Sequence, residues 1–248
     1  MSNRPARVAV CLAVVVLILS TAAVLPKLRA DPGDGRCSQT AGAAFGWGTP
    51  NRADDFTDPS SLADWEIYDS PGHAGNGRRT PTAVSVVDHA LTVTGDKHGN
   101  SGGMAWMPGQ LYGRWEACAK SPAAAVGYHS LLLLWPDAND TPSGGEVDFM
   151  ELTDPARQAA EFWLHYGPED KRDFSDIQID ATQWHSWAVE WTPWHIAAYV
   201  DGKMWWETKN VAHLPPRRMH LCIQLDNMGG DIDLGAHMMV DWVRQYWI

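Results

Sequence analysis

Apolar and polar residues alternate along much of the chain, and this alternation predicts β-strands. In ALTVTG (residues 90–95) Leu and Val alternate with Thr, and in MHLCIQLD (residues 219–226) four apolar residues alternate with His, Cys, Gln and Asp. A strand with this period of two presents one set of side chains to each face. HSLLLLW (residues 129–135) is a short, unbroken apolar run, which is typical of a strand buried on both faces.

Turn signals between these runs indicate that the strands pair as hairpins. In HIAAYVDGKMWWET two strand-like runs meet at Asp201-Gly202, a dipeptide that favours tight hairpin turns. No long stretch has the period of an amphipathic helix, and many short strands are separated by Gly and Pro. The sequence therefore predicts an all-β fold, a two-sheet antiparallel β-sandwich, over residues 53–248 without an internal repeat or a second domain.

The first thirty residues have a different pattern, that of a secretory signal. Two arginines precede an apolar run over residues 8–25 that has small residues near its end. Cleavage after Ala22 and cleavage after Ala30 both fit this pattern. The run is also long enough to span a bilayer, so an uncleaved membrane anchor over residues 1–30 is the alternative. In both cases we expect residue 31 onward to lie outside the cytoplasm, secreted or in the cell envelope.

Charge and composition after this segment limit the partners. Residues 31–52 are rich in Gly, Ala, Pro and Asp and predict an irregular lead-in. Removal of residues 1–30 removes four of the 19 basic residues and none of the 30 acidic ones, which leaves a formal charge of −15. A surface this acidic argues against nucleic acid and anionic lipid as charge-driven partners. We expect a monomer that acts on a neutral or cationic substrate and contacts a membrane only if the N-terminal segment is uncleaved.

Three cysteines, Cys37, Cys118 and Cys222, follow residue 30. In an oxidising compartment we expect one disulfide among them, with all three pairings open and one thiol left over. Their spacing matches no zinc motif, and the ten histidines include no HExxH. We therefore expect catalysis to need no metal and no other cofactor.

Tryptophan is unusually abundant, with 14 residues in a chain of 248. Most of these side chains are expected to fill the core, because buried aromatic rings contribute large apolar areas. Trp205 and Trp206 are adjacent, however, and in a regular strand they face opposite sides and do not both enter one core. We therefore expect some tryptophans on a concave face, where the flat ring stacks on the apolar face of a sugar.

The stretch GGEVDFMEL places three carboxylates, Glu146, Asp148 and Glu151, within a hydrophobic run. Strict alternation in a strand would put Glu151 on the face opposite to the other two acids. One extra residue at Phe149-Met150, a β-bulge, brings all three acids to one face, and bulges are frequent beside active sites. The stretch therefore predicts a bulged strand that presents three carboxylates to a common space.

Grouped carboxylates suit the hydrolysis of a glycosidic bond. That reaction needs one carboxyl group as proton donor and a second as nucleophile or base, and like charges at close range separate their protonation states. Carboxyl groups about 5–5.5 Å apart are typical of the retaining mechanism. A solvated outer face would need no bulge, and calcium loops alternate acids with turn residues rather than with Val, Phe and Met. We therefore place catalysis ahead of both alternatives.

The motif GGEVDFME resembles the bulged ExDxxE signature of glycoside hydrolase family 16, as found in laminarinase-like β-1,3-glucanases. The resemblance continues in order through LYGRWEACAK, LLLLWPD, FWLHYG, WAVEWTPWHIAAYVDG and MMVDWVRQYWI. It covers the chain from about residue 54 to residue 248. Several motifs in the family's order make the resemblance specific, whereas the three acids alone would be only suggestive.

The resemblance implies a jelly roll similar to concanavalin A, with a concave substrate cleft and a retaining mechanism. Glu146 matches the nucleophile, Glu151 the general acid/base, and Asp148 the residue that assists the nucleophile. His165 matches the family histidine near the acid/base. Asp241 matches an aspartate that helps to bind a structural calcium on the convex side of many members.

The resemblance also suggests residues that bind substrate. The family tryptophan of the FWLLP strand is displaced here by two residues to Trp135, which keeps the same face of the strand. Gln224 and Asn227 stand where the family often places Asn for substrate contact. Trp106 and Trp163 complete the predicted set.

The leading hypothesis is a secreted, endo-acting β-glucan hydrolase, with β-1,3 linkages favoured by the bulged motif. A transglycosylase on the same fold is one alternative, although such branches usually carry the unbulged motif. A carbohydrate-binding surface protein without catalysis is another, but such proteins commonly lose one of the three acids. Hydrolysis of a sulfated galactan is disfavoured by the acidic charge.

Overall fold

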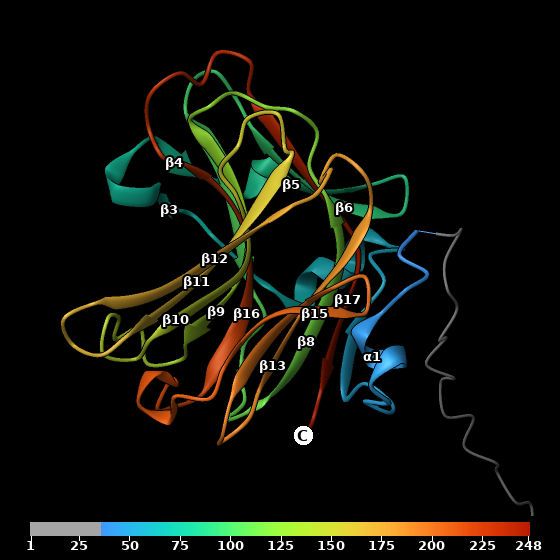
Figure 1. Cartoon of the computed structure of the whole chain (residues 1–248). Helices are drawn as coiled ribbons and strands as arrows, with labels where there is room; N and C mark the ends of the chain where they lie inside the picture. Colours follow the sequence, from blue (N-terminus) through green and yellow to red (C-terminus); the bar gives the residue numbers. More distant parts are fainter. Residues whose placement is uncertain (1–35) are drawn as a thin grey trace, which may run out of the picture. The chain divides into compact units, whose positions relative to one another are not determined.

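The computed structural model describes residues 36–248 (Figure 1). The predicted signal peptide or membrane anchor over residues 1–30 lies outside the described residues. Within residues 36–248, no helix has the length and apolar character that a membrane crossing requires.

Two large sheets form the fold. In the first, the strands lie in the order β15 (Lys203–Thr208), β14 (Ile196–Val200), β13 (His185–Trp191), β8 (Gly113–Lys120), β17 (Ala236–Tyr246), β6 (Ala90–Gly95) and β5 (Val84–Val87), and β1 (Arg52–Asp54) pairs with β17. In the second, the order is β12 (Lys171–Gln178), β11 (Ala159–Tyr166), β10 (Glu146–Leu152), β9 (Tyr128–Pro136), β16 (Met219–Asn227), β7 (Asn100–Ala105), β4 (Arg78–Arg79) and β3 (Ser70–Pro71), and β2 (Glu66–Ile67) pairs with β7. Figure 1 shows β9 to β12 in one layer and β8, β13 and β17 in the other.

Helical structure among the described residues is confined to short segments. These are α1 (Ala41–Ala44) and four 3₁₀ turns, η1 (Pro59–Asp64), η2 (His73–Gly75), η3 (Pro81–Ala83) and η4 (Val211–His213). The strand pairs are antiparallel except for β4 with β7, which is parallel. The predicted all-β, two-sheet sandwich is confirmed.

The core lies between the sheets, and alternation along each strand decides which side chains enter it. In β16 the residues Leu221, Ile223 and Leu225 belong to the core, whereas Cys222 and Gln224 face the opposite side of the sheet. The hydrophobic effect drives this partition, since each fully buried aliphatic side chain contributes about 1.5–3 kcal/mol. The predicted strand is therefore present, and its polar face remains available for a site.

The predicted hairpin at Asp201-Gly202 is also present, because β14 and β15 flank it and both turn residues have the positive φ that such turns require. The expectation that Trp205 and Trp206 face opposite sides is wrong. Ala198 pairs with Trp206 and Tyr199 with Met204, so Trp205 is the extra residue of a bulge. Both rings pack against the core, and both contact Phe162.

Residues 36–52, the described part of the predicted lead-in, pack onto the first sheet. A disulfide joins Cys37 to Cys118 on β8, and Cys222 is a buried free thiol. Glu116, also on β8, accepts hydrogen bonds from the backbone N–H groups of Ala41 and Gly42. Burial raises the pKa of Glu116, and these hydrogen bonds oppose the rise. A covalent bond and buried polar contacts thus hold this segment against the sandwich.

Candidate active site

The catalytic candidates are positioned by a bulge in β10. Asp148 pairs with Leu133 of β9 and Met150 with Leu132, so that Phe149 is the extra residue. Phe149 and Met150 are 0% and 1% exposed and belong to the core. Because two successive side chains turn inward, Glu151 returns to the side of Glu146 and Asp148. The predicted bulge is confirmed, together with its effect on the three acids.

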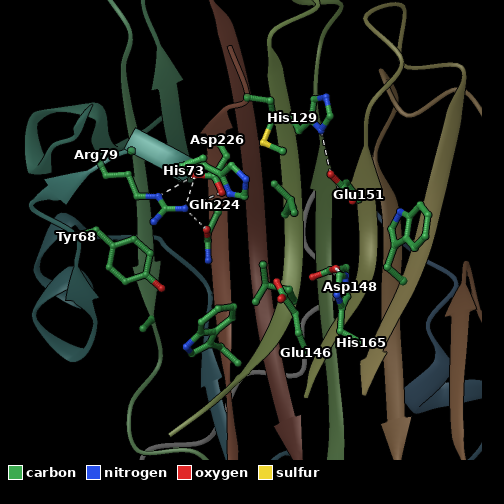
Figure 2. Close-up of a pocket in the computed structure, with 18 of the residues that line it drawn as sticks. Tyr68, His73, Arg79, His129, Glu146, Asp148, Glu151, His165, Gln224 and Asp226 are labelled. Carbon is green, nitrogen blue, oxygen red and sulfur yellow. Dashed lines mark hydrogen bonds and ion pairs between the residues drawn. The ribbon is translucent and has the colours of Figure 1, made fainter. Parts of the chain in front are cut away.

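The three acids line a cleft of about 910 Å³ on the outer side of the second sheet (Figure 2). Four of the predicted substrate-binding residues also line it, namely Trp135, Trp163, His165 and Gln224. The indole N–H of Trp135 donates to Asn139 at 2.6 Å, which fixes the ring at the cleft wall. Residues from β9, β10, β11 and β16 therefore converge on one space.

Two predicted substrate contacts do not reach this cleft. Trp106 is 1% exposed and stacks on Trp65 in the core, with ring centroids 4.9 Å apart. Ala105, the residue before it, lines the cleft, so alternation turns Trp106 inward. Asn227 follows Asp226, which lines the cleft, and instead accepts a hydrogen bond from the N–H of Gly229 at 2.9 Å. Asn227 thus holds the turn after β16.

Burial and crowding control the protonation of the first two acids. Burial raises the pKa of Glu146 to about 7, its interaction with Asp148 opposes the rise, and the charge of Glu151 adds to it. Burial is also the main cause that raises the pKa of Asp148 well above its usual range, with further contributions from the charges of Glu146 and Glu151. Asp148 is the more deeply enclosed of the two, so it retains its proton while Glu146 ionises.

His165 lies beside Asp148 rather than beside Glu151. Its Nε2 is 3.7 Å from Asp148 Oδ2, and its Nδ1 is 2.8 Å from Asp170 Oδ1. Its strand partner on β10 is Glu146. The position predicted near the acid/base is therefore corrected, and the histidine in contact with Glu151 is His129, with Nδ1 2.9 Å from Glu151 Oε1.

Sequence reasoning missed a second polar group across the cleft. Arg79 donates to Asp226 through Nε at 2.8 Å and to Gln224 through Nη2 at 2.9 Å (Figure 2). Asp226 stands two residues after Gln224 in β16 and so shares its face, which is a signal that the sequence contains. Arg79 comes from the two-residue strand β4, whose placement beside β7 is a long-range pairing without a sequence signal.

Glu161 is a further carboxylate beside the three acids of β10. It pairs with Glu151 across β10 and β11. Thr153 Oγ1 donates to one of its oxygens at 2.7 Å, and the Trp163 indole N–H donates to the other at 2.9 Å. These hydrogen bonds stabilise a charge that would otherwise destabilise the strand pair.

The cleft floor also has an apolar part. Leu131, Leu133 and Cys222 form a cluster on this face of the sheet, against which Tyr68 and Trp135 pack. The Tyr68 hydroxyl is 3.1 Å from the sulfur of Cys222. Apolar floor, aromatic wall and polar rim are the combination that suits a carbohydrate.

The structural calcium at Asp241 stays a prediction. Among the described residues, Asp241 Oδ1 forms an ion pair with Arg36 Nη1 at 3.0 Å. Across residues 36–248 there is also no group of three or more His, Cys, Asp or Glu side chains that could hold a metal.

Comparisons with known proteins agree with this geometry. A sequence profile described as Glycosyl hydrolases family 16 matches residues 75–244, more than half of the chain. A search of curated proteins gave no match.

Similar solved structures include the laminarinase from Rhodothermus marinus, with 20% identity, a TM-score of 0.73 and coverage of 81% of this chain and 98% of that one. The endo-β-1,3-glucanase from Pyrococcus furiosus has 18% identity, a TM-score of 0.70 and coverage of 80% and 94%. A family 16 protein from Bacteroides ovatus, in complex with a mixed-linkage glucan product, has 18% identity, a TM-score of 0.68 and coverage of 78% and 99%. These similarities show the jelly-roll fold.

Proposed function

Because the chain belongs to glycosyl hydrolase family 16, we propose that this glycoside hydrolase is a secreted, endo-acting enzyme that cleaves β-1,3-linked glucan with retention. The observation that carries the proposal is the set of three carboxylates on one face of the bulged strand β10, at the cleft. The solved laminarinase and endo-β-1,3-glucanase structures with the same fold support this choice of linkage.

In the first step, the ionised carboxylate of Glu146 attacks the anomeric carbon. Glu151 donates its proton to the glycosidic oxygen as the bond to the leaving sugar breaks. Asp148 keeps its proton and leaves the negative charge on Glu146, which is the group that must be ionised to attack. The product of this step is a glycosyl-enzyme ester on Glu146.

In the second step, the Glu151 carboxylate takes a proton from water while the water oxygen attacks the anomeric carbon. The ester bond to Glu146 breaks, and the sugar leaves with its original anomeric configuration. Both proton transfers use the same carboxyl group, so the orientation of Glu151 matters in both steps.

The charge around the cleft favours an uncharged glycan. Seven acidic side chains and two arginines line it, and one of these arginines, Arg79, is paired with Asp226. A sulfated or uronic polymer would be repelled. The disulfide Cys37–Cys118 supports the assignment to an oxidising compartment outside the cytoplasm.

The direct test is a panel of linear β-1,3-glucan, mixed β-1,3/1,4-glucan, xyloglucan and agarose, with products sized by mass spectrometry. We expect short β-1,3-linked oligosaccharides from the wild type and none from Glu146→Gln. Products longer than the chains of the starting polysaccharide would show transglycosylation instead. Binding without products would show a lectin, and either result would contradict the proposal.

A further inference from the structure

We propose that His129 is a positioning residue for the acid/base Glu151, an inference that rests on the function proposed above. The hydrogen bond from His129 Nδ1 to Glu151 Oε1 is 2.9 Å long. Figure 2 shows this pair set apart from the group of Glu146, Asp148 and His165. Each of the two catalytic glutamates thus has its own neighbours.

The register between β9 and β10 places His129 beside Glu151. Glu151 pairs with Leu131 of β9, and His129 stands two residues before Leu131. A separation of two keeps His129 on the cleft face, one step along the strand from Glu151. The two side chains are 18% and 13% exposed, so solvent competes weakly for their hydrogen bond.

The chemistry of the two side chains determines which atom carries the proton of their hydrogen bond. A carboxylate only accepts hydrogen bonds, so when Glu151 is ionised the His129 Nδ1 must carry the proton of the bond. With Oε1 engaged in this way, the proton that Glu151 transfers resides on Oε2. His129 therefore selects the oxygen that faces the glycosidic bond and restrains rotation of the carboxyl group.

The other charged groups around the pair have partners of their own. Glu161, opposite Glu151 on β11, accepts from Thr153 and Trp163. Asp226, opposite His129 on β16, is paired with Arg79. Glu146 and Asp148 lie farther along β10 and contribute charge to the same cleft.

The test compares two variants on two substrates. His129→Asn keeps an N–H donor at the position of Nδ1, whereas His129→Leu removes it. Linear β-1,3-glucan needs a proton on its leaving oxygen, but a 2,4-dinitrophenyl β-glycoside of β-1,3-linked glucobiose does not. The matched control is His237→Asn, an exposed histidine of β17 in the other sheet.

We expect His129→Leu to lower kcat/KM on the glucan by roughly 10- to 100-fold, a part of what a general acid contributes. On the dinitrophenyl glycoside the loss should stay within about threefold, because no proton is required there. His129→Asn should recover most of the glucan activity, and His237→Asn should match the wild type.

A spectroscopic readout tests the contact without turnover. In the ¹⁵N spectrum of the wild type, the His129 imidazole should show the Nδ1–H form, and Glu151→Ala should shift it toward the Nε2–H form. An unchanged His129 spectrum, or an equal loss on both substrates in His129→Leu, would overturn the positioning role while the proposed function stands. A wild type inactive on both substrates would overturn the proposed function as well.

Discussion

At the scale of single residues, the site depends on Glu146, a carboxyl group whose ionisation is opposed by burial. In the proposed mechanism Glu146 must be charged to attack, yet burial raises its pKa to about 7. Asp148 lowers this cost because it retains its own proton beside Glu146. Function and stability therefore make opposite demands on the same buried side chain.

The raised pKa predicts a pH dependence of activity. On the acidic side, kcat/KM should rise with pH through about 7, as Glu146 in the free enzyme ionises. Asp148→Ala should move this rise of kcat/KM to higher pH, because Glu146 loses the neighbour that favours its charged form. The measurement is kcat/KM against pH on linear β-1,3-glucan. A rise at the same pH in the wild type and the variant would contradict the role of Asp148 beside Glu146.

The same shift predicts a pH dependence of stability. Between the ordinary glutamate pKa and about 7, folded Glu146 holds a proton that the unfolded chain has released. The free energy of unfolding therefore falls as pH rises through this range. Glu146→Gln should abolish turnover but raise the free energy of unfolding by about 1–3 kcal/mol at pH 8, and by much less at pH 5. Denaturant unfolding at the two pH values checks this, and an equal effect at both would argue against it.

At the scale of elements, two bulges place the side chains that regular strands would misplace. The bulge of β10 turns Phe149 and Met150 inward, and the bulge of β15 lets Trp205 and Trp206 share one core. The first was predictable because three acids with apolar spacers fit no regular strand. The second was not, because two adjacent tryptophans fit a regular strand with one ring on each face.

The bulge of β15 has a measurable consequence for stability. Trp205→Ala and Trp206→Ala should each lower the free energy of unfolding by about 2–4 kcal/mol, since both side chains pack against the core. In a regular strand one of the two substitutions would be nearly neutral. Trp194→Ala, at a ring that is 69% exposed, is the control. The denaturant midpoints of the three variants, compared with that of the wild type, test this prediction.

The substrate-binding residues were predicted from the family resemblance, and alternation was used only for Trp135. Trp135, Trp163 and Gln224 lie at the cleft, but Trp106 and Asn227 do not. Each of these two stands one residue after a residue that lines the cleft, so alternation turns it away. Arg79 reaches the cleft through the pairing of β4 with β7, about which alternation within one strand contains no information. His129 shares the cleft face of β9 with Trp135, but its contact with Glu151 also depends on the register between β9 and β10.

At the scale of the whole domain, the disulfide ties the N-terminal part of the described chain to the sandwich. Cys37 and Cys118 are separated by 81 residues, and closing a loop of this size is expected to stabilise the fold by about 2–4 kcal/mol. Cys37→Ala should therefore lower the free energy of unfolding by that amount under oxidising conditions. Under reducing conditions the variant and the wild type should converge. A difference that persists after reduction would mean that local packing, rather than the bond, provides the stability.

In the proposed mechanism Glu146 forms a covalent bond with the substrate, and trapping this ester is the decisive experiment. The enzyme would be incubated with the 2,4-dinitrophenyl β-glycoside of 2-deoxy-2-fluoro β-1,3-linked glucobiose, whose fluorine slows the second step, and then digested and mapped by mass spectrometry. We expect the mass of one disaccharide on Glu146 and no adduct in Glu146→Gln. An adduct on another residue, or turnover of β-1,3-glucan to the inverted anomer, would contradict it.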